Sequence, residues 1–169
     1  MARSKGGAGP GDPMAQAIAS LARCDRTVLE MRRLLRRKGH APAAIDGVIE
    51  RLLRMRYLDD RAYAGRYAAW AVSRKGLGRA AVRARLAARG VEREAIDAGL
   101  AAGFGPAGEM EALRRALSDV HGPLDRAGAR RLAARLARRG FPEDMIREAL
   151  ARRREDPDEP LPDEGETRR

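Results

Sequence analysis

Apolar and polar positions recur in this chain at intervals of 51 and 50 residues. Three glycines mark the repeat, each directly after a basic residue: Gly39, Gly90 and Gly140. Met, Val or Leu lies eight residues before each glycine and Leu four before, while Ile lies six after and Ile or Leu ten after. Because residues four apart share one face of an α-helix, the pattern predicts two amphipathic helices around each glycine, in three copies.

Each glycine is expected to end the first helix of its pair. In a Schellman turn the residue that follows the helix cap has a positive φ, which glycine adopts most easily. The leucine four positions earlier would then contact the residue after the glycine, which explains why that column is apolar. Pro42 and Pro142 fall in the first turn of the next helix, where no backbone N–H is required.

A further helix is predicted before each pair. It spans about residues 14–23 in the first copy and about 107–120 in the third, and in the second Asp59 caps a helix that extends to about residue 74. Thr27 and Glu30 have the spacing of a capping box, which begins the next helix at Val28.

No segment predicts a strand, so the expected fold is all-α, with three tandem three-helix repeats. A Gly-rich N-terminal tail and an acidic C-terminal tail are expected to be disordered. The predicted order is tail 1–13, repeats 14–56, 57–104 and 105–154, and tail 155–169.

The net charge of +11 is unevenly distributed along the chain. Residues 155–166 hold seven acidic side chains and no base, whereas residues 14–154 hold 31 Lys or Arg against 16 Asp or Glu, a net charge of +15. A body this basic favours a polyanion or an acidic protein as partner. The single cysteine, Cys24, excludes an intramolecular disulfide framework, and no apolar run is typical of a leader or a membrane span. We expect a cytoplasmic protein without membrane contact.

The basic side chains concentrate on the helix before each glycine. Many are four residues apart, a spacing at which like charges destabilise an isolated helix by ~0.2–0.5 kcal/mol per pair. Their repetition favours a stripe that faces a polyanion, and the alternative is a solvated helix face. The candidate contacts are Arg32, Arg33, Arg36, Arg37, Lys38, Arg74, Lys75, Arg79, Arg83, Arg85, Arg89, Arg131, Arg135, Arg138 and Arg139.

Two other groups of residues have simpler structural explanations. Asp59 and Asp60 could suggest a metal site or acid catalysis, but a helix cap explains both. Tyr63, Tyr67 and Trp70 lie on one helical face and could stack on bases, although such a stripe is more often part of the core.

The remaining motifs predict neither an enzyme nor a cofactor or metal site. Residues 76–81 match a loose dinucleotide fingerprint, but a helix precedes them, so Gly76 and Gly78 are expected only to separate two helices. The two histidines and the one cysteine are too few and too scattered for zinc.

Several of these residues resemble the RecX family. The resemblance is carried by Leu58-Asp59-Asp60, Tyr63-Ala64, Tyr67, Arg74-Lys75-Gly76, Gly78, Leu86, Arg89-Gly90-Val91 and Arg138-Arg139-Gly140-Phe141. It implies a curved, elongated array of three-helix repeats. It also implies a non-enzymatic protein that binds RecA filaments on single-stranded DNA and modulates, usually inhibiting, the recombinase and ATPase activities. We expect this protein to be a monomer that also binds DNA alone, weakly and in a salt-dependent way. The alternative is a non-specific nucleic-acid-binding protein that acts without RecA.

Overall fold

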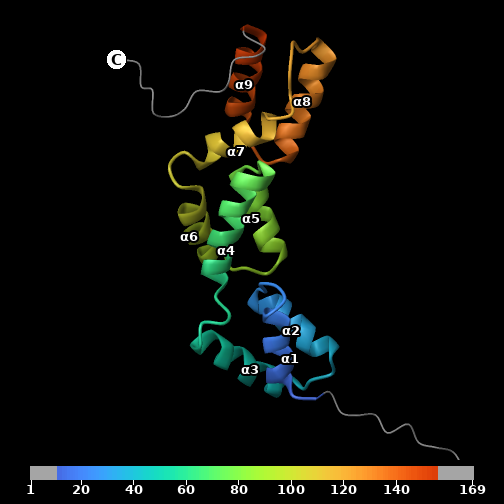
Figure 1. The fold of residues 1–169 in the computed structure, drawn as a ribbon, viewed down its shortest axis with the longest axis vertical. Helices are drawn as coiled ribbons and strands as arrows, with labels where there is room; N and C mark the ends of the chain where they lie inside the picture. Colours follow the sequence, from blue (N-terminus) through green and yellow to red (C-terminus); the bar gives the residue numbers. More distant parts are fainter. Residues whose placement is uncertain (1–10, 156–169) are drawn as a thin grey trace, which may run out of the picture.

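The computed structural model describes residues 11–155, so the two predicted tails lie almost entirely outside it. Within this range the chain forms nine α-helices, one π-helical turn (η1) and no strand, which confirms the all-α class (Figure 1). In chain order the elements are α1 (Pro13–Leu21), α2 (Val28–Arg37), α3 (Pro42–Arg54), α4 (Asp60–Trp70), η1 (Ala71–Lys75), α5 (Arg79–Ala88), α6 (Arg93–Phe104), α7 (Gly108–Leu117), α8 (Arg126–Arg138) and α9 (Glu143–Glu155).

The helices form an elongated body, with α1–α3 at one end and α8–α9 at the other (Figure 1). Helices α2, α5 and α8 follow one another along the long axis, so the three basic helices share one side of the molecule. We refer to α1–α3, α4–α6 with η1, and α7–α9 as sets of helices. Helix α7 packs mainly against η1 of the preceding set, while α8 and α9 form a hairpin beyond α7.

A Schellman turn ends each basic helix, as the glycine columns predict. After α2, the Gly39 N–H donates to the Arg36 carbonyl (3.0 Å), and the His40 N–H donates to the Leu35 carbonyl (3.3 Å). The same two bonds end α5 and α8. The three glycines have φ values of 87°, 77° and 84°, in the left-handed region that favours glycine.

Two separate groups of buried side chains form the core. One lies within α1–α3, with Met31, Leu35 and Leu52 at its centre and Leu58 added from the next loop. The other runs continuously from α4 to α9. The first three helices therefore have a core of their own, whereas the rest of the described chain shares one.

The predicted helix from Asp59 to about residue 74 changes character at Ala71, where a π-helical turn replaces the α-helix. Gly76 then ends the turn in the left-handed conformation, with φ of 56°. A Cβ on Gly76 would overlap the backbone of Ala112 and Ala116 in α7. The glycine therefore lets α7 lie directly against the turn, besides separating two helices.

Residues 11–155 contain neither a membrane-spanning helix nor a cluster of possible metal ligands. No helix in this range is long and apolar enough to cross a membrane. No group of three or more His, Cys, Asp or Glu side chains there could hold a metal ion.

Candidate nucleic-acid interface

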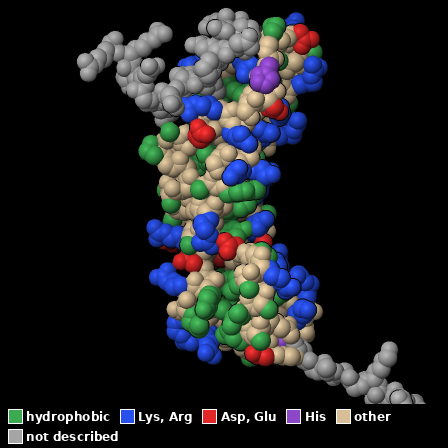
Figure 2. Space-filling view, in the orientation of Figure 1, with side chains coloured by type: hydrophobic (Ala, Val, Ile, Leu, Met, Phe, Trp, Pro, Cys, Tyr) green, Lys and Arg blue, Asp and Glu red, His purple; other side chains and the backbone are tan. Residues whose placement is uncertain are grey.

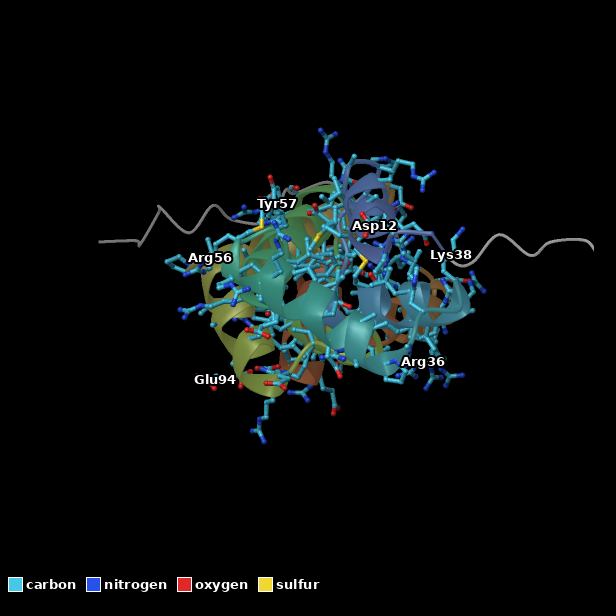
Figure 3. The ribbon with its side chains drawn as sticks, turned by 90° about the horizontal axis from the view of Figure 1, so that it is seen from below. Asp12, Arg36, Lys38, Arg56, Tyr57 and Glu94 are labelled. Atoms are coloured by element: carbon cyan, nitrogen blue, oxygen red, sulfur yellow. The ribbon has the colours of Figure 1, made fainter. Side chains whose placement is uncertain are left out.

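The predicted contact residues on α2, α5 and α8, and at the ends of these helices, divide into two groups according to their partners. In the first group the side chain is exposed and makes no ion pair with any residue that the structure describes. We call this group the basic stripe: Arg33, Arg36, Arg37, Lys38, Arg85, Arg131 and Arg138. Figure 2 shows Lys and Arg side chains at every level of the side formed by these helices. In Figure 3, Arg36 and Lys38 project outward from the body.

The second group of predicted contact residues is engaged within the protein. Arg32 pairs with Asp46, and Arg83 pairs with Asp97. In both cases the arginine lies seven residues before the glycine and the aspartate seven after it, so the pair joins the two helices of one hairpin. These four side chains are largely exposed, so each pair contributes at most about 1 kcal/mol.

The other engaged bases bind across longer distances in the chain. Arg79 pairs with Glu109 (3.2 Å), and its guanidinium lies 4.7 Å from the centre of the Phe104 ring. Arg135 pairs with Asp119 (3.2 Å), and both Arg135 and Arg139 donate to the carbonyl of Ala116 in α7. Arg89 belongs to the junction described next. These bases therefore contribute to contacts between elements of the fold.

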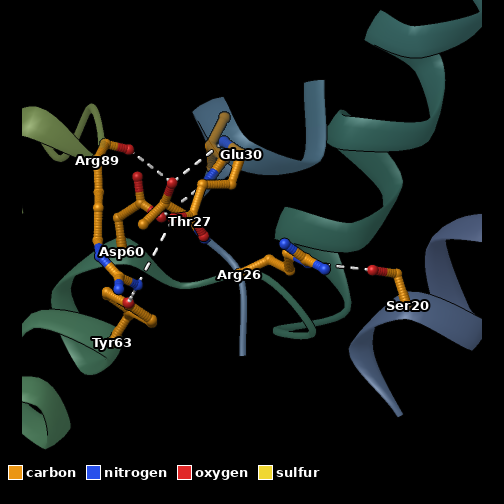
Figure 4. Close-up of polar contacts among 8 residues, drawn as sticks. Ser20, Arg26, Thr27, Glu30, Asp60, Tyr63 and Arg89 are labelled. Carbon is orange, nitrogen blue, oxygen red and sulfur yellow. Dashed lines mark hydrogen bonds and ion pairs between the residues drawn. The ribbon is translucent and has the colours of Figure 1, made fainter. Parts of the chain in front are cut away.

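The junction between α2 and α5 explains why the basic helices follow one another. Thr27, the buried N-cap of α2, donates from its hydroxyl to the Arg89 carbonyl at the end of α5 (2.8 Å). The Val28 N–H donates to the Asp60 carboxylate (2.9 Å), and Arg89 donates to the Tyr63 hydroxyl and pairs with Glu30 (3.5 Å). Figure 4 shows these contacts. The Val28 N–H, an orphan donor at the start of α2, thus finds its acceptor on α4.

The junction between α5 and α8 has the same construction. The Gly78 N–H, at the N-cap of α5, donates to the Arg139 carbonyl at the end of α8 (2.8 Å). The Arg79 N–H, in the first turn, donates to the Glu109 carboxylate (2.9 Å). The starts of α2 and α5 therefore each meet the glycine turn of the next basic helix. Each start is also capped by a carboxylate, from Asp60 at the start of α4 or from Glu109 at the start of α7.

Neighbouring aspartates at the first junction have opposite pKa shifts. The Ala62 N–H, together with Arg56, lowers the pKa of Asp59, the N-cap of α4. Burial raises the pKa of Asp60, by more than its hydrogen bond from Val28 lowers it. Asp59 caps α4, as the sequence predicts. Asp60, however, caps α2 as well as lying in the first turn of α4.

The aromatic stripe of α4 is mostly structural. Tyr63 is buried, and its ring stacks with Tyr67 at 6.2 Å between centres. Arg89 lies over both tyrosine rings. Trp70 is exposed, with the Lys75 ammonium 5.4 Å from its ring centre, and Arg74 is exposed beside it in η1. Only Trp70 of the three aromatic side chains is largely open to solvent.

Over the described residues the geometry defines an all-α protein whose basic helices meet end to end along one side. The family model for the first three-helix domain of RecX matches residues 14–52, and that for the second three-helix domain matches residues 59–100. The Regulatory protein RecX of Thermobifida fusca (strain YX) is 33% identical over 175 residues, covering 95% of this chain and 92% of the relative. That of Xanthomonas campestris pv. campestris (strain B100) is 33% identical over 140 residues, covering 80% and 83%. The chain belongs to the RecX family of regulatory proteins.

Solved structures agree with this fold. The crystal structure of RecX from Lactobacillus salivarius superposes with a TM-score of 0.72 at 16% identity, covering 86% of this chain and 96% of the other. A second crystal structure, of a regulatory protein RecX, gives a TM-score of 0.73 at 17% identity, covering 85% and 73%.

Proposed function

We propose that this chain is a non-enzymatic, monomeric cytoplasmic regulator that binds RecA filaments on single-stranded DNA and inhibits the recombinase and ATPase activities of RecA. It needs no cofactor. Membership of the RecX family supports the choice of RecA. The observation that carries the DNA contact is the basic stripe, whose bases have no carboxylate partner among the described residues.

Helix electrostatics account for only part of the stripe. A cation in the last turn of a helix stabilises it by about 0.3–1 kcal/mol. One base would suffice for that, yet α2 ends in Arg36, Arg37 and Lys38, all exposed. Junctions of similar construction join α2 to α5 and α5 to α8, so the stripe extends over all three basic helices. This arrangement suits a partner with regularly spaced phosphates.

The test reverses one stripe base on each basic helix: Arg36→Glu, Arg85→Glu and Arg138→Glu. Arg32, Arg83 and Arg135 are left intact because they form ion pairs, so reversing them would mix loss of folding with loss of binding. The matched control makes the same change of charge at three exposed bases outside the basic helices, none of which forms an ion pair with a described residue: Arg23→Glu, Arg61→Glu and Arg115→Glu.

The stripe variant should bind both naked single-stranded DNA and RecA filaments more weakly than the control. Each lost phosphate contact removes ~0.7 from the slope of log K against log salt, so three lost contacts lower the slope by about 2. Because contacts to RecA itself remain, the variant should still prefer filament to naked DNA and still lower ATP hydrolysis when added in excess. Binding and slope equal to those of the control would show that the stripe is only a solvated face.

A non-specific DNA-binding protein would give a different result with the wild-type chain. It would bind naked DNA as tightly as the filament, and the triple reversal would remove binding and ATPase inhibition together. That outcome would replace the proposal with the alternative of a nucleic-acid-binding protein that acts without RecA.

A further inference from the structure

Exposed apolar side chains concentrate at one end of the molecule. Five large apolar side chains in the described range are exposed by 42–58%, and four of them lie in α1–α3 and the segment that follows: Ile18, Leu53, Met55 and Tyr57. Figure 2 shows hydrophobic side chains gathered on the part of the surface formed by these helices. Scattered exposed apolar residues need no explanation, but a local concentration indicates an interaction surface.

Three of the four lie in the segment 53–57, which we call the elbow. The elbow ends α3 with a Schellman turn: the Arg56 N–H donates to the Leu53 carbonyl (3.0 Å), and the Tyr57 N–H donates to the Leu52 carbonyl (2.9 Å). Arg56 holds the position that glycine occupies after α2, α5 and α8, and its φ is 59°. No other non-glycine residue that the structure describes has a positive φ. Such strain, where it persists, points to a use for the side chain.

The charges around the elbow nearly cancel. Arg54 pairs with Glu50 (3.0 Å), and Arg56 pairs with Asp59 (3.1 Å), which leaves Arg51 as the one base without a described partner in this segment. The basic stripe has no such compensation. The elbow therefore has the composition of a protein-binding surface, in which Tyr, Met and Arg are enriched. Leu53 and Met55 offer neither an aromatic face to a base nor a charge to a phosphate.

The elbow and the stripe lie on opposite sides of the first three helices. In the end-on view of Figure 3, Arg56 and Tyr57 are on one side, and Arg36 and Lys38 are on the other. One molecule can therefore hold nucleic acid with one side of α1–α3 and a protein surface with the other.

We propose that the elbow is the surface that contacts the protein component of the filament, with Met55, Tyr57 and Arg56 as its principal contacts. This inference rests on the proposed function, and it separates the surface that binds RecA from the surface that binds DNA. The RecA surface that binds the elbow is apolar and weakly acidic, because it complements the exposed apolar side chains and the small positive net charge around the elbow.

The experiment compares Met55→Ser/Tyr57→Ser with the matched control Trp70→Ser, which removes an exposed apolar side chain of α4 instead. The measured quantities are affinity for RecA filament and for the same single-stranded DNA without RecA. The double variant should lose tenfold or more in filament affinity, the size expected for interface anchors, while its affinity for naked DNA stays within twofold of wild type. The control should keep both affinities.

Arg56→Gly is a second variant. Its expected result combines higher thermal stability with weaker filament binding, which misfolding cannot produce. Glycine relieves the left-handed backbone, so thermal unfolding should shift upward by about 2–4 °C, while filament affinity falls with the loss of the side chain. Unchanged filament affinity in both variants would overturn the inference, as would an equal loss of naked-DNA affinity, which would make the elbow a nucleic-acid contact. A wild-type chain with no preference for filament would instead overturn the proposed function itself.

Discussion

Gly90 and Gly122 have similar backbone conformations but different surroundings. Their φ values are 77° and 70°. A Cβ on Gly122 would meet no atom within 4 Å, whereas a Cβ on Gly90 would overlap the side chain of Leu29 in α2. Gly90 therefore serves two purposes, since it permits the left-handed turn after α5 and also allows the close approach of α2.

The pair of alanine variants should separate these purposes. Gly122→Ala should lower the free energy of unfolding by about 1 kcal/mol, the usual cost of a left-handed L residue. Gly90→Ala should lower it by about 2–4 kcal/mol, because Leu29 must also move, and Gly90→Val should lower it further because its branched Cβ tolerates positive φ worst. Urea unfolding followed by circular dichroism measures these differences. Equal losses of unfolding free energy for the two alanine variants would mean that the Leu29 side chain moves aside without cost and that the junction is not tightly packed.

At the scale of the helix, the caps at the first junction respond oppositely to pH. Asp59 has a lowered pKa, so its contribution to stability is present above its usual value of 3.8 and is lost as the pH falls. Asp60 has a raised pKa, so its contribution is present below 3.8 and is lost as the pH rises through the folded value.

Neutral substitutions test this opposition directly. At pH 7, Asp60→Asn should stabilise the protein, since the amide oxygen can still accept from Val28 without a buried charge. At the same pH, Asp59→Asn should destabilise it. The Asp60→Asn difference should shrink at pH 4, because the raised pKa of Asp60 favours the protonated carboxyl there. The Asp59→Asn difference should largely persist at pH 4, because the lowered pKa of Asp59 keeps that carboxylate charged. Urea unfolding at the two pH values gives the result, and a destabilised Asp60→Asn at pH 7 would contradict the assigned burial.

The helices and their turns could be predicted from the sequence because their causes are local. The glycine columns predict the Schellman turns, and Thr27 with Glu30 predicts the capping box that the structure contains. The π-helical turn at Ala71 leaves no comparable pattern, since the residues that favour it lie on α7.

Which basic side chains form ion pairs and which remain without a partner could be predicted from the sequence only in part. Asp46 and Asp97 form a column seven residues after the glycine, which could have identified Arg32 and Arg83 as ion-paired. The carboxylates that cap α2 and α5 could not be found in this way. Asp60 and Glu109 differ in residue type, lie in the next set of helices, and stand 30 and 31 residues before the following glycine. Their roles depend on how the sets dock, which no local pattern contains.

The two hydrophobic cores divide the described chain into a smaller and a larger part. Helices α4–α9 share one continuous apolar core, whereas α1–α3 have their own and meet the rest through a largely polar junction. A fragment of residues 59–155 should therefore unfold cooperatively, close to the full-length midpoint. A fragment of residues 11–104 should unfold at a clearly lower temperature, because it lacks α7 against η1. Thermal circular dichroism compares them, and the reverse order of midpoints would contradict the continuous core.

The repeated junction has a consequence for orientation. Because the start of α2 meets the end of α5, and the start of α5 meets the end of α8, the three helices point the same way along the axis. Moving along the axis by one set of helices brings one junction onto the next. Turning the molecule end for end does not, because the amide groups at the helix starts then take the places of the carbonyl groups at the helix ends. The molecule thus has polarity, as does a nucleic-acid strand with its 5′ and 3′ ends. Copies aligned along one strand would all face the same direction, and the two ends of a filament would present different surfaces to them.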